Sequence, residues 1–191
     1  PQYNKPEIVA KKSEKENDIQ ESMEVTQGKL IIGMDLDINV DNLRYDVMIY
    51  NSLFGGSANS KLFQNVREKA SLAYTASSSY YRFKNNIFIN CGIEIPNYEK
   101  ALEIIKQQIE DMKKGDFTDE EVENAKKGII ASIKTIDDEQ DTEITYFFSQ
   151  ELSQNKCDIE QYINRIAAVN KEKVIEIANK VSINTIYFLK D

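Results

Sequence analysis

The sequence predicts an α+β domain in which a mostly antiparallel sheet carries helices packed on one face, giving two layers. Residues 29–38 alternate apolar and polar side chains, which is the period-two pattern of a strand with one buried face. Residues 72–83 and 87–95 are rich in Thr, Tyr, Phe and Ile and are joined by a short polar triplet, as in a hairpin. Several segments with helical spacing then precede a last strand at 183–189.

Length and composition indicate one globular domain. The chain has 191 residues, of which 41% are hydrophobic and 29% charged, so it is long enough to bury one substantial core. We expect this single domain at residues 25–191. Residues 1–24 are polar and charged, so we expect a linker or arm there. The first residue is Pro1 and not Met, which indicates a fragment or a processed piece.

The first predicted strand, at 29–38, turns Leu30, Ile32, Met34, Leu36 and Ile38 to one face. Asp41 is then expected to cap a helix with a core-facing stripe of Leu43, Val47, Tyr50 and Phe54. Two glycines in succession, Gly55 and Gly56, end this helix because they make its continuation costly and permit a reversal of the backbone.

A short second helix follows, for which Ser57, Asn59 and Ser60 are candidate caps. Its apolar side consists of Leu62, Phe63 and Val66. Arg67 lies near its last turn, and Tyr74 stands at the head of the next strand. A cation leaving a helix end and a phenol at the start of the following strand can point into one space.

The rest of the chain is predicted to be mainly helical. A helix from Tyr98 to Met112 closes at Lys113, Lys114 and Gly115, and a capping box of Thr118 and Glu121 opens the next one. A third helix has an apolar side of Ile144, Phe147, Phe148 and Leu152, and Asp158 and Asn170 are expected to cap two more. In the hairpin, the alternation of residues 87–95 makes Cys91 a core position.

Charge and cysteine content exclude several classes of function. The net charge of -8 argues against nucleic acid or an anionic membrane as a partner, since both are bound by clustered Lys and Arg. No apolar run approaches the ~20 residues that span a bilayer, and no signal peptide is visible. Two cysteines, Cys91 and Cys157, make no disulfide framework and fit a reducing compartment, so a cytoplasmic location is expected.

The chain contains no histidine. This excludes Ser-His and Cys-His triads and leaves too few good ligands for a zinc site, so no metal site is predicted in this chain. Carboxylates crowd together at residues 137–143, where a calcium loop and a solvated helix start are the alternatives. We favour the helix start, because an EF-hand loop needs a glycine turn that is missing here.

Residues 54–83 resemble the second, zinc-free half of the pitrilysin/insulinase-type zinc metallopeptidases, the inverzincins, whose halves are mitochondrial-processing-peptidase-like. A Gly-Gly loop, a Ser-(Lys/Arg)-Leu-Phe helix start, an Arg-Glu and a Leu-Ala-Tyr recur in that family in this order. The matching residues are Gly55, Gly56, Ser60, Lys61, Leu62, Phe63, Arg67, Glu68, Leu72, Ala73 and Tyr74.

The resemblance implies a clamshell of two such halves around an extended peptide, with zinc held by a His-x-x-Glu-His (HxxEH) motif of the other half. That half would belong to the same polypeptide or to a partner chain, and a dimer is possible. By carry-over, Arg67 binds a substrate carbonyl and Tyr74 donates to the oxyanion of the transition state. Gly55, Gly56 and Ser57 form a possible cavity loop.

Two alternatives stay open from the sequence. Arg67 could simply pair with Glu68 or another acid while Tyr74 packs on the sheet. The whole chain could also be a non-catalytic structural or assembly partner, because the resembled family includes members that keep the fold without the metal.

Overall fold

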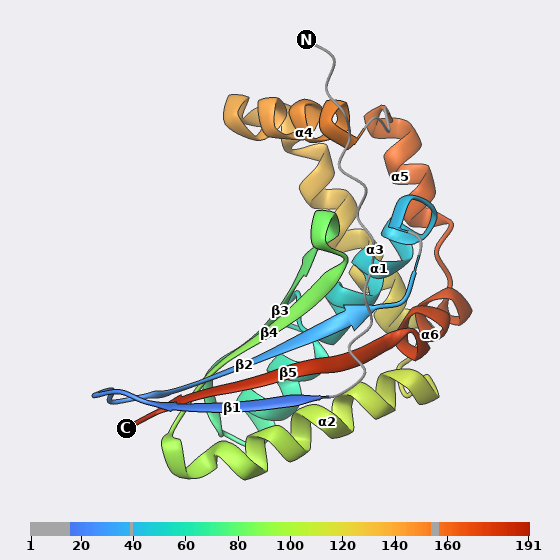
Figure 1. Cartoon of the computed structure of the whole chain (residues 1–191). Helices are drawn as coiled ribbons and strands as arrows, with labels where there is room; N and C mark the ends of the chain where they lie inside the picture. The colour runs from blue at the N-terminus through green and yellow to red at the C-terminus, as the bar shows by residue number, and fades with distance from the viewer. Residues whose placement is uncertain (1–15, 39, 154–156) are drawn as a thin grey trace.

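The computed structural model describes residues 16–38, 40–153 and 157–191, and in it five strands form one sheet in the order β1-β5-β2-β4-β3 (Figure 1). The strands are β1 (Asn17–Ser22), β2 (Gly28–Leu36), β3 (Ala73–Tyr81), β4 (Asn86–Ile93) and β5 (Val181–Lys190). All neighbouring pairs are antiparallel except β1 and β5, which are parallel. The predicted α+β class with a mostly antiparallel sheet is confirmed.

Helices cover one face of this sheet (Figure 1). They are α1 (Val40–Phe54), a π-helix (Phe63–Lys69), α2 (Tyr98–Lys114), α3 (Asp119–Lys134), α4 (Gln140–Ser153), α5 (Ile159–Ala167) and α6 (Lys171–Asn179). The helices α1, α2 and α6 lie closest to the sheet. The helices α3, α4 and α5 lie farther from it, past α1. Within the described ranges, no helix is both long enough and apolar enough to cross a bilayer.

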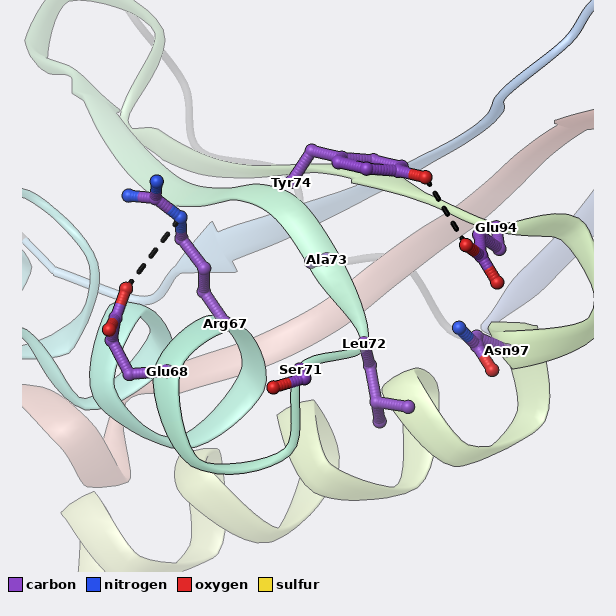
Figure 2. A pocket seen from close by; sticks show the side chains of 8 residues that line it. All are labelled: Arg67, Glu68, Ser71, Leu72, Ala73, Tyr74, Glu94 and Asn97. Carbon is purple, nitrogen blue, oxygen red and sulfur yellow. Dashed lines mark hydrogen bonds and ion pairs between the residues drawn. The ribbon is translucent and has the colours of Figure 1, made fainter.

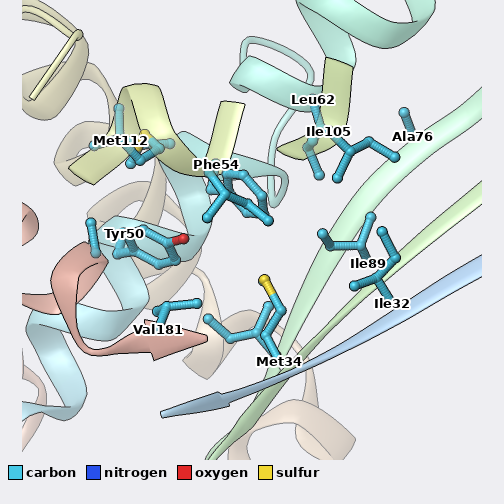
Figure 3. Close-up of a cluster of buried hydrophobic side chains, with 14 of the residues drawn as sticks. Ile32, Met34, Tyr50, Phe54, Leu62, Ala76, Ile89, Ile105, Met112 and Val181 are labelled. Atoms are coloured by element: carbon cyan, nitrogen blue, oxygen red, sulfur yellow. The ribbon is translucent and has the colours of Figure 1, made fainter. Parts of the chain in front are cut away.

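The core lies between the sheet and the first helix layer, as Figure 3 shows. From β2, the alternate residues Leu30, Ile32, Met34 and Leu36 point into it and are at most 1% exposed. The α1 stripe of Val47, Tyr50 and Phe54 meets them and is fully buried, and the Tyr50 and Phe54 rings stack with centroids 5.6 Å apart. Both period-based predictions are therefore confirmed for these residues, whereas Ile38, beyond the end of β2, and Leu43 of the same predicted faces are only partly buried.

Local chemistry sets the helix ends as predicted. The Thr118 hydroxyl accepts a hydrogen bond from the Glu121 backbone N–H at 3.1 Å, and the Glu121 carboxylate accepts one from the Thr118 N–H at 2.8 Å, which completes the capping box. Gly115 ends α2 with φ +75, a conformation that favours glycine. The Asp158 and Asn170 side chains accept from the backbone N–H groups of the third helical residues of α5 and α6.

The expectation of a linker or arm over residues 1–24 is wrong for its described end, because residues 17–22 form strand β1. This strand pairs in parallel with β5, from Asn17 opposite Thr185 to Ser22 opposite Lys190. All six of its residues are exposed. β1 is held by backbone pairing to the sheet edge and by exposed side-chain hydrogen bonds, such as the one from the Tyr187 hydroxyl to Glu21 at 2.6 Å. Because no face of β1 is buried, its sequence has no apolar alternation that could have revealed the strand.

The apolar side of α4 is present but uncovered. Ile144, Phe147 and Phe148 are 58%, 53% and 62% exposed. The helix leaves α3 at the 3-10 turn Ile136–Asp138 and projects beyond the sheet (Figure 1). Helical periodicity thus predicted the element and its apolar side, whereas it carried no information about which surface covers that side.

Candidate functional site

Arg67 is placed by the π-helix. Its wide turns, closed by i→i+5 hydrogen bonds, bury Val66 completely and bring Arg67 to the surface near the last turn. The Arg67 guanidinium lies 4.6 Å from the centroid of the Phe63 ring, one π-turn earlier, in a cation–π contact. The Ser60 hydroxyl accepts from the Phe63 N–H at 3.4 Å, so the predicted capping by Ser60 is confirmed.

Tyr74 is placed by an irregularity in the sheet. Ala73 of β3 lies opposite Ile93 of β4, but Thr75 already lies opposite Gly92, so Tyr74 is the additional residue of a β-bulge. Bulges redirect side chains that would otherwise follow the alternation of the strand. Ser71, with φ 53, turns the chain between the π-helix and β3 in a conformation that a residue with a Cβ rarely adopts.

The π-helix and the β-bulge bring Arg67 and Tyr74 to one pocket of about 410 Å³ (Figure 2). The walls are completed by Glu68, Ser71, Leu72, Ala73, Glu94 and Asn97. The π-helix, the start of β3 and the end of β4 all contribute to it. Figure 2 shows the Tyr74 ring extending over the pocket toward Glu94, with Arg67 on the helix beside it.

Glu94 is the partner of Tyr74. The phenol donates to Glu94 Oε1 at 3.2 Å, and the negative charge of Glu94 raises the pKa of Tyr74 above its ordinary range. Tyr74 is 52% exposed, so this phenol is a protonated and accessible donor at neutral pH. Sequence reasoning did not select Glu94. The available signal was the hairpin register, which puts the end of the second strand against the start of the first.

Arg67 makes the contact that the alternative interpretation of the sequence expected. Its Nε lies 3.8 Å from Glu68 Oε1, with both side chains about half exposed (43% and 51%). An exposed ion pair at this separation is worth ~1 kcal/mol or less. Arg67 is therefore held only weakly by Glu68, which lines the same pocket.

The predicted cavity loop lies elsewhere. Gly55 packs directly against β3, where its carbonyl accepts from the Ser78 N–H at 2.9 Å. Gly56 lines a different pocket, and the Ser57 hydroxyl donates to the Ser52 carbonyl at 3.1 Å. None of the three residues lines the pocket of Arg67 and Tyr74, and a role for them in substrate binding stays a prediction.

The residues of this chain do not fit zinc. Across residues 16–38, 40–153 and 157–191, no three His, Cys, Asp or Glu side chains form a group that could hold a metal ion. The whole sequence has no histidine, and both cysteines are buried as free thiols. The pocket offers a phenol, a guanidinium and two carboxylates, which is chemistry for binding and polarising a polar ligand.

Comparison with known proteins places the fold. The family model described as the peptidase M16 inactive domain matches residues 1–129. A Bacillus subtilis protein named probable inactive metalloprotease YmfF is 39% identical over 169 residues, covering 87% of this chain and 39% of its own length. The crystal structure of a conserved protein from Enterococcus faecalis superposes with a TM-score of 0.87 at 30% identity, over 93% of this chain and 42% of that one.

A peptidase M16 inactive domain from Pseudomonas fluorescens shares the fold, with a TM-score of 0.80 at 18% identity over 100% of this chain and 47% of that one. The chain thus spans less than half the length of these relatives. The family inferred from the motif between Gly55 and Tyr74 is confirmed. This chain belongs to the peptidase M16 family and carries its inactive-domain fold.

Proposed function

We propose that this chain is the substrate-binding, zinc-free half of a metalloendopeptidase of the M16 type. The observation that carries the proposal is the shared pocket of Arg67 and Tyr74, with Glu94 accepting a hydrogen bond from the phenol. The greater length of the relatives agrees with a second half that contacts this one. That HxxEH-bearing half, in the same polypeptide or in a partner chain, would supply the metal.

In this function Arg67 and Tyr74 contact the peptide backbone. The weak pair with Glu68 leaves Arg67 able to donate to a substrate carbonyl. The Tyr74 phenol, which is protonated at neutral pH, donates to the carbonyl oxygen as that oxygen becomes negative under attack. Glu94 accepts from the phenol in the absence of substrate and so holds the ring over the pocket.

The test is peptide hydrolysis by the assembly of this chain with its HxxEH-bearing half. Tyr74→Phe should lower kcat by about 10²- to 10³-fold, the usual effect of losing one oxyanion donor, with zinc content and melting temperature unchanged. Tyr81→Phe is the matched control, because Tyr81 is also on β3 and 49% exposed but lies outside the pocket. An unchanged rate in Tyr74→Phe would refute the catalytic role.

A second candidate is a non-catalytic partner with the same fold. The relative named probable inactive metalloprotease, at 39% identity, favours it. In that case the wild-type assembly would contain no zinc and cleave no peptide. Binding of a labelled peptide, weakened in Arg67→Gln, would then show that the pocket binds peptides without cleaving them.

A further inference from the structure

A second cavity, of about 390 Å³, lies at the other end of β3 and shares no lining residue with the pocket of Arg67 and Tyr74. Helix α1 contributes Arg44 and Met48 to it, the hairpin end contributes Tyr80 and Arg82, and α3 contributes Ile129. We call it the Arg44 cavity. The proposed peptidase function makes no use of it.

Arg44 is a buried cation with incomplete pairing. It is 3% exposed, and its Nε has no hydrogen-bond partner among the described residues. One terminal nitrogen donates to the Tyr45 hydroxyl, and the guanidinium lies 4.4 Å from the Tyr45 ring centroid and 5.6 Å from that of Tyr162. Where side chains are described, no carboxylate forms an ion pair with it. Aromatic contacts offset only part of the cost of burying a charge.

Further positive charge gathers at the same place. The chain has four arginines, and three of them, Arg44, Arg82 and Arg165, surround Tyr45 and Tyr162. Arg165 donates to the Tyr45 hydroxyl at 3.3 Å, and Arg82 lines the cavity together with Arg44. In a chain with a net charge of -8, such a concentration of guanidinium groups indicates a site for an anion.

The remaining lining defines the rest of the ligand. Met48 and Ile129 present apolar surface, and the Tyr80 ring adds to it. A volume of about 390 Å³ falls in the range of small-molecule pockets. Guanidinium groups match a carboxylate because they present paired N–H donors in one plane. We propose that the Arg44 cavity binds a carboxylate that carries an apolar group, with Arg44 and Arg82 holding the carboxylate and Met48 and Ile129 contacting the apolar group.

The first experiment compares N-acetyl-leucine with N-acetyl-leucinamide by isothermal titration calorimetry on the whole chain. The acid and the amide differ in charge and hardly in shape. We expect the acid to bind at least about tenfold more tightly, and we expect Arg82→Gln to remove at least about tenfold of that affinity. Lys100→Gln, which removes an exposed positive charge on α2 outside both pockets, is the matched control and should leave binding unchanged.

Three results would overturn the proposal: equal binding of acid and amide, no binding of the acid, or tighter binding of inorganic phosphate than of the acid. Arg44→Met provides a second variant that keeps the side-chain volume and removes the charge. If it binds N-acetyl-leucine as the wild type does, the assignment of Arg44 is wrong. If the variant loses this binding and unfolds at the same urea concentration as the wild type, the charge of Arg44 is needed for ligand binding and not for stability.

A further experiment distinguishes two possible ligands that both carry a carboxylate, a peptide C-terminus and a free small acid. A short peptide ending in leucine with a free carboxylate should bind more tightly than N-acetyl-leucine if the ligand is a peptide C-terminus. Exclusion of the peptide, with binding of the small acid retained, identifies a free carboxylate. Both outcomes support the carboxylate site.

Discussion

At the scale of single residues, backbone contact decides which glycines this fold requires. A Cβ at Gly55 would lie 2.5 Å from Ser78 Oγ and 2.6 Å from the Ser78 backbone nitrogen, whereas a Cβ at Gly128 would meet nothing within 4 Å. Gly55 therefore holds α1 close to β3, and Gly128 lies exposed on α3. The two positions make a matched pair.

We expect Gly55→Ala to lower the free energy of unfolding by about 1–3 kcal/mol, because the new methyl group must displace backbone. Gly128→Ala should raise it by about 0.5–1 kcal/mol, since alanine favours the helix. Urea denaturation of both variants checks the pair. Equal effects at the two positions would show that close approach at Gly55 is not what the fold needs.

The Cys91 thiol gives a pH-dependent contribution to stability. Burial raises the pKa of Cys91 from its ordinary value of 9.0 to about 12. Between these values the unfolded chain has lost the proton that the folded chain retains, so stability falls as the pH rises. The Cys91 thiol alone should lower the free energy of unfolding by about 2 kcal/mol when the pH is raised from about 8 to about 10.5.

Buried Tyr162, whose pKa is likewise raised, to about 12, adds to this loss at higher pH. Urea denaturation of the wild type and of Cys91→Ala at both pH values separates the two residues. The variant should be less stable at about pH 8 and should lose less stability on going to the higher pH. Parallel losses in the two proteins would contradict the assignment to Cys91.

At the scale of elements, α4 shows how amphipathicity and burial separate. Phe148 on α4 is 62% exposed, whereas Phe54 on α1 is fully buried. We expect Phe148→Ala to change the free energy of unfolding by less than about 0.5 kcal/mol and Phe54→Ala to lower it by about 3–5 kcal/mol. Chemical denaturation measures both. A large loss in Phe148→Ala would mean that this face is covered within the chain.

The π-helix and the β-bulge are the elements that form the Arg67 pocket. Each inserts one residue into a regular pattern, and each shifts one functional side chain, Arg67 or Tyr74. The motif around these residues was visible in the sequence. The irregularities were not, because a seven-residue helix and a nine-residue strand have almost the same composition with or without an inserted residue.

At the scale of the whole molecule, the residues that could bind a metal ion lead to a prediction about zinc. The sequence holds no histidine, and the described residues form no group of metal ligands. We expect the purified chain, dialysed against zinc and then against buffer, to retain well below one zinc per molecule by elemental analysis. As a control for zinc bound by cysteine, the two thiols are alkylated in the unfolded chain before refolding. Retention of one zinc per molecule after this alkylation would contradict the prediction.

The charge of the molecule is also unevenly arranged. The chain is acidic overall, yet three of its four arginines surround Tyr45 and Tyr162 at the Arg44 cavity. Net charge, the quantity available from composition, argues against nucleic acid as a partner, and this stays a prediction. It gave no indication of a local cationic site, since charges far apart in sequence meet there.

The sequence by itself determined the fold class, the family, the strands with apolar alternation and the helix ends set by Thr118, Asp158, Asn170 and Gly115. These depend on interactions within a few residues, so they are written locally in the chain. The tertiary structure decided that residues 17–22 form a parallel edge strand, that α4 is uncovered, and that Glu94 supports Tyr74. Each of these depends on a partner distant in sequence, or on the lack of one in the described chain, and local patterns carry no information about such partners.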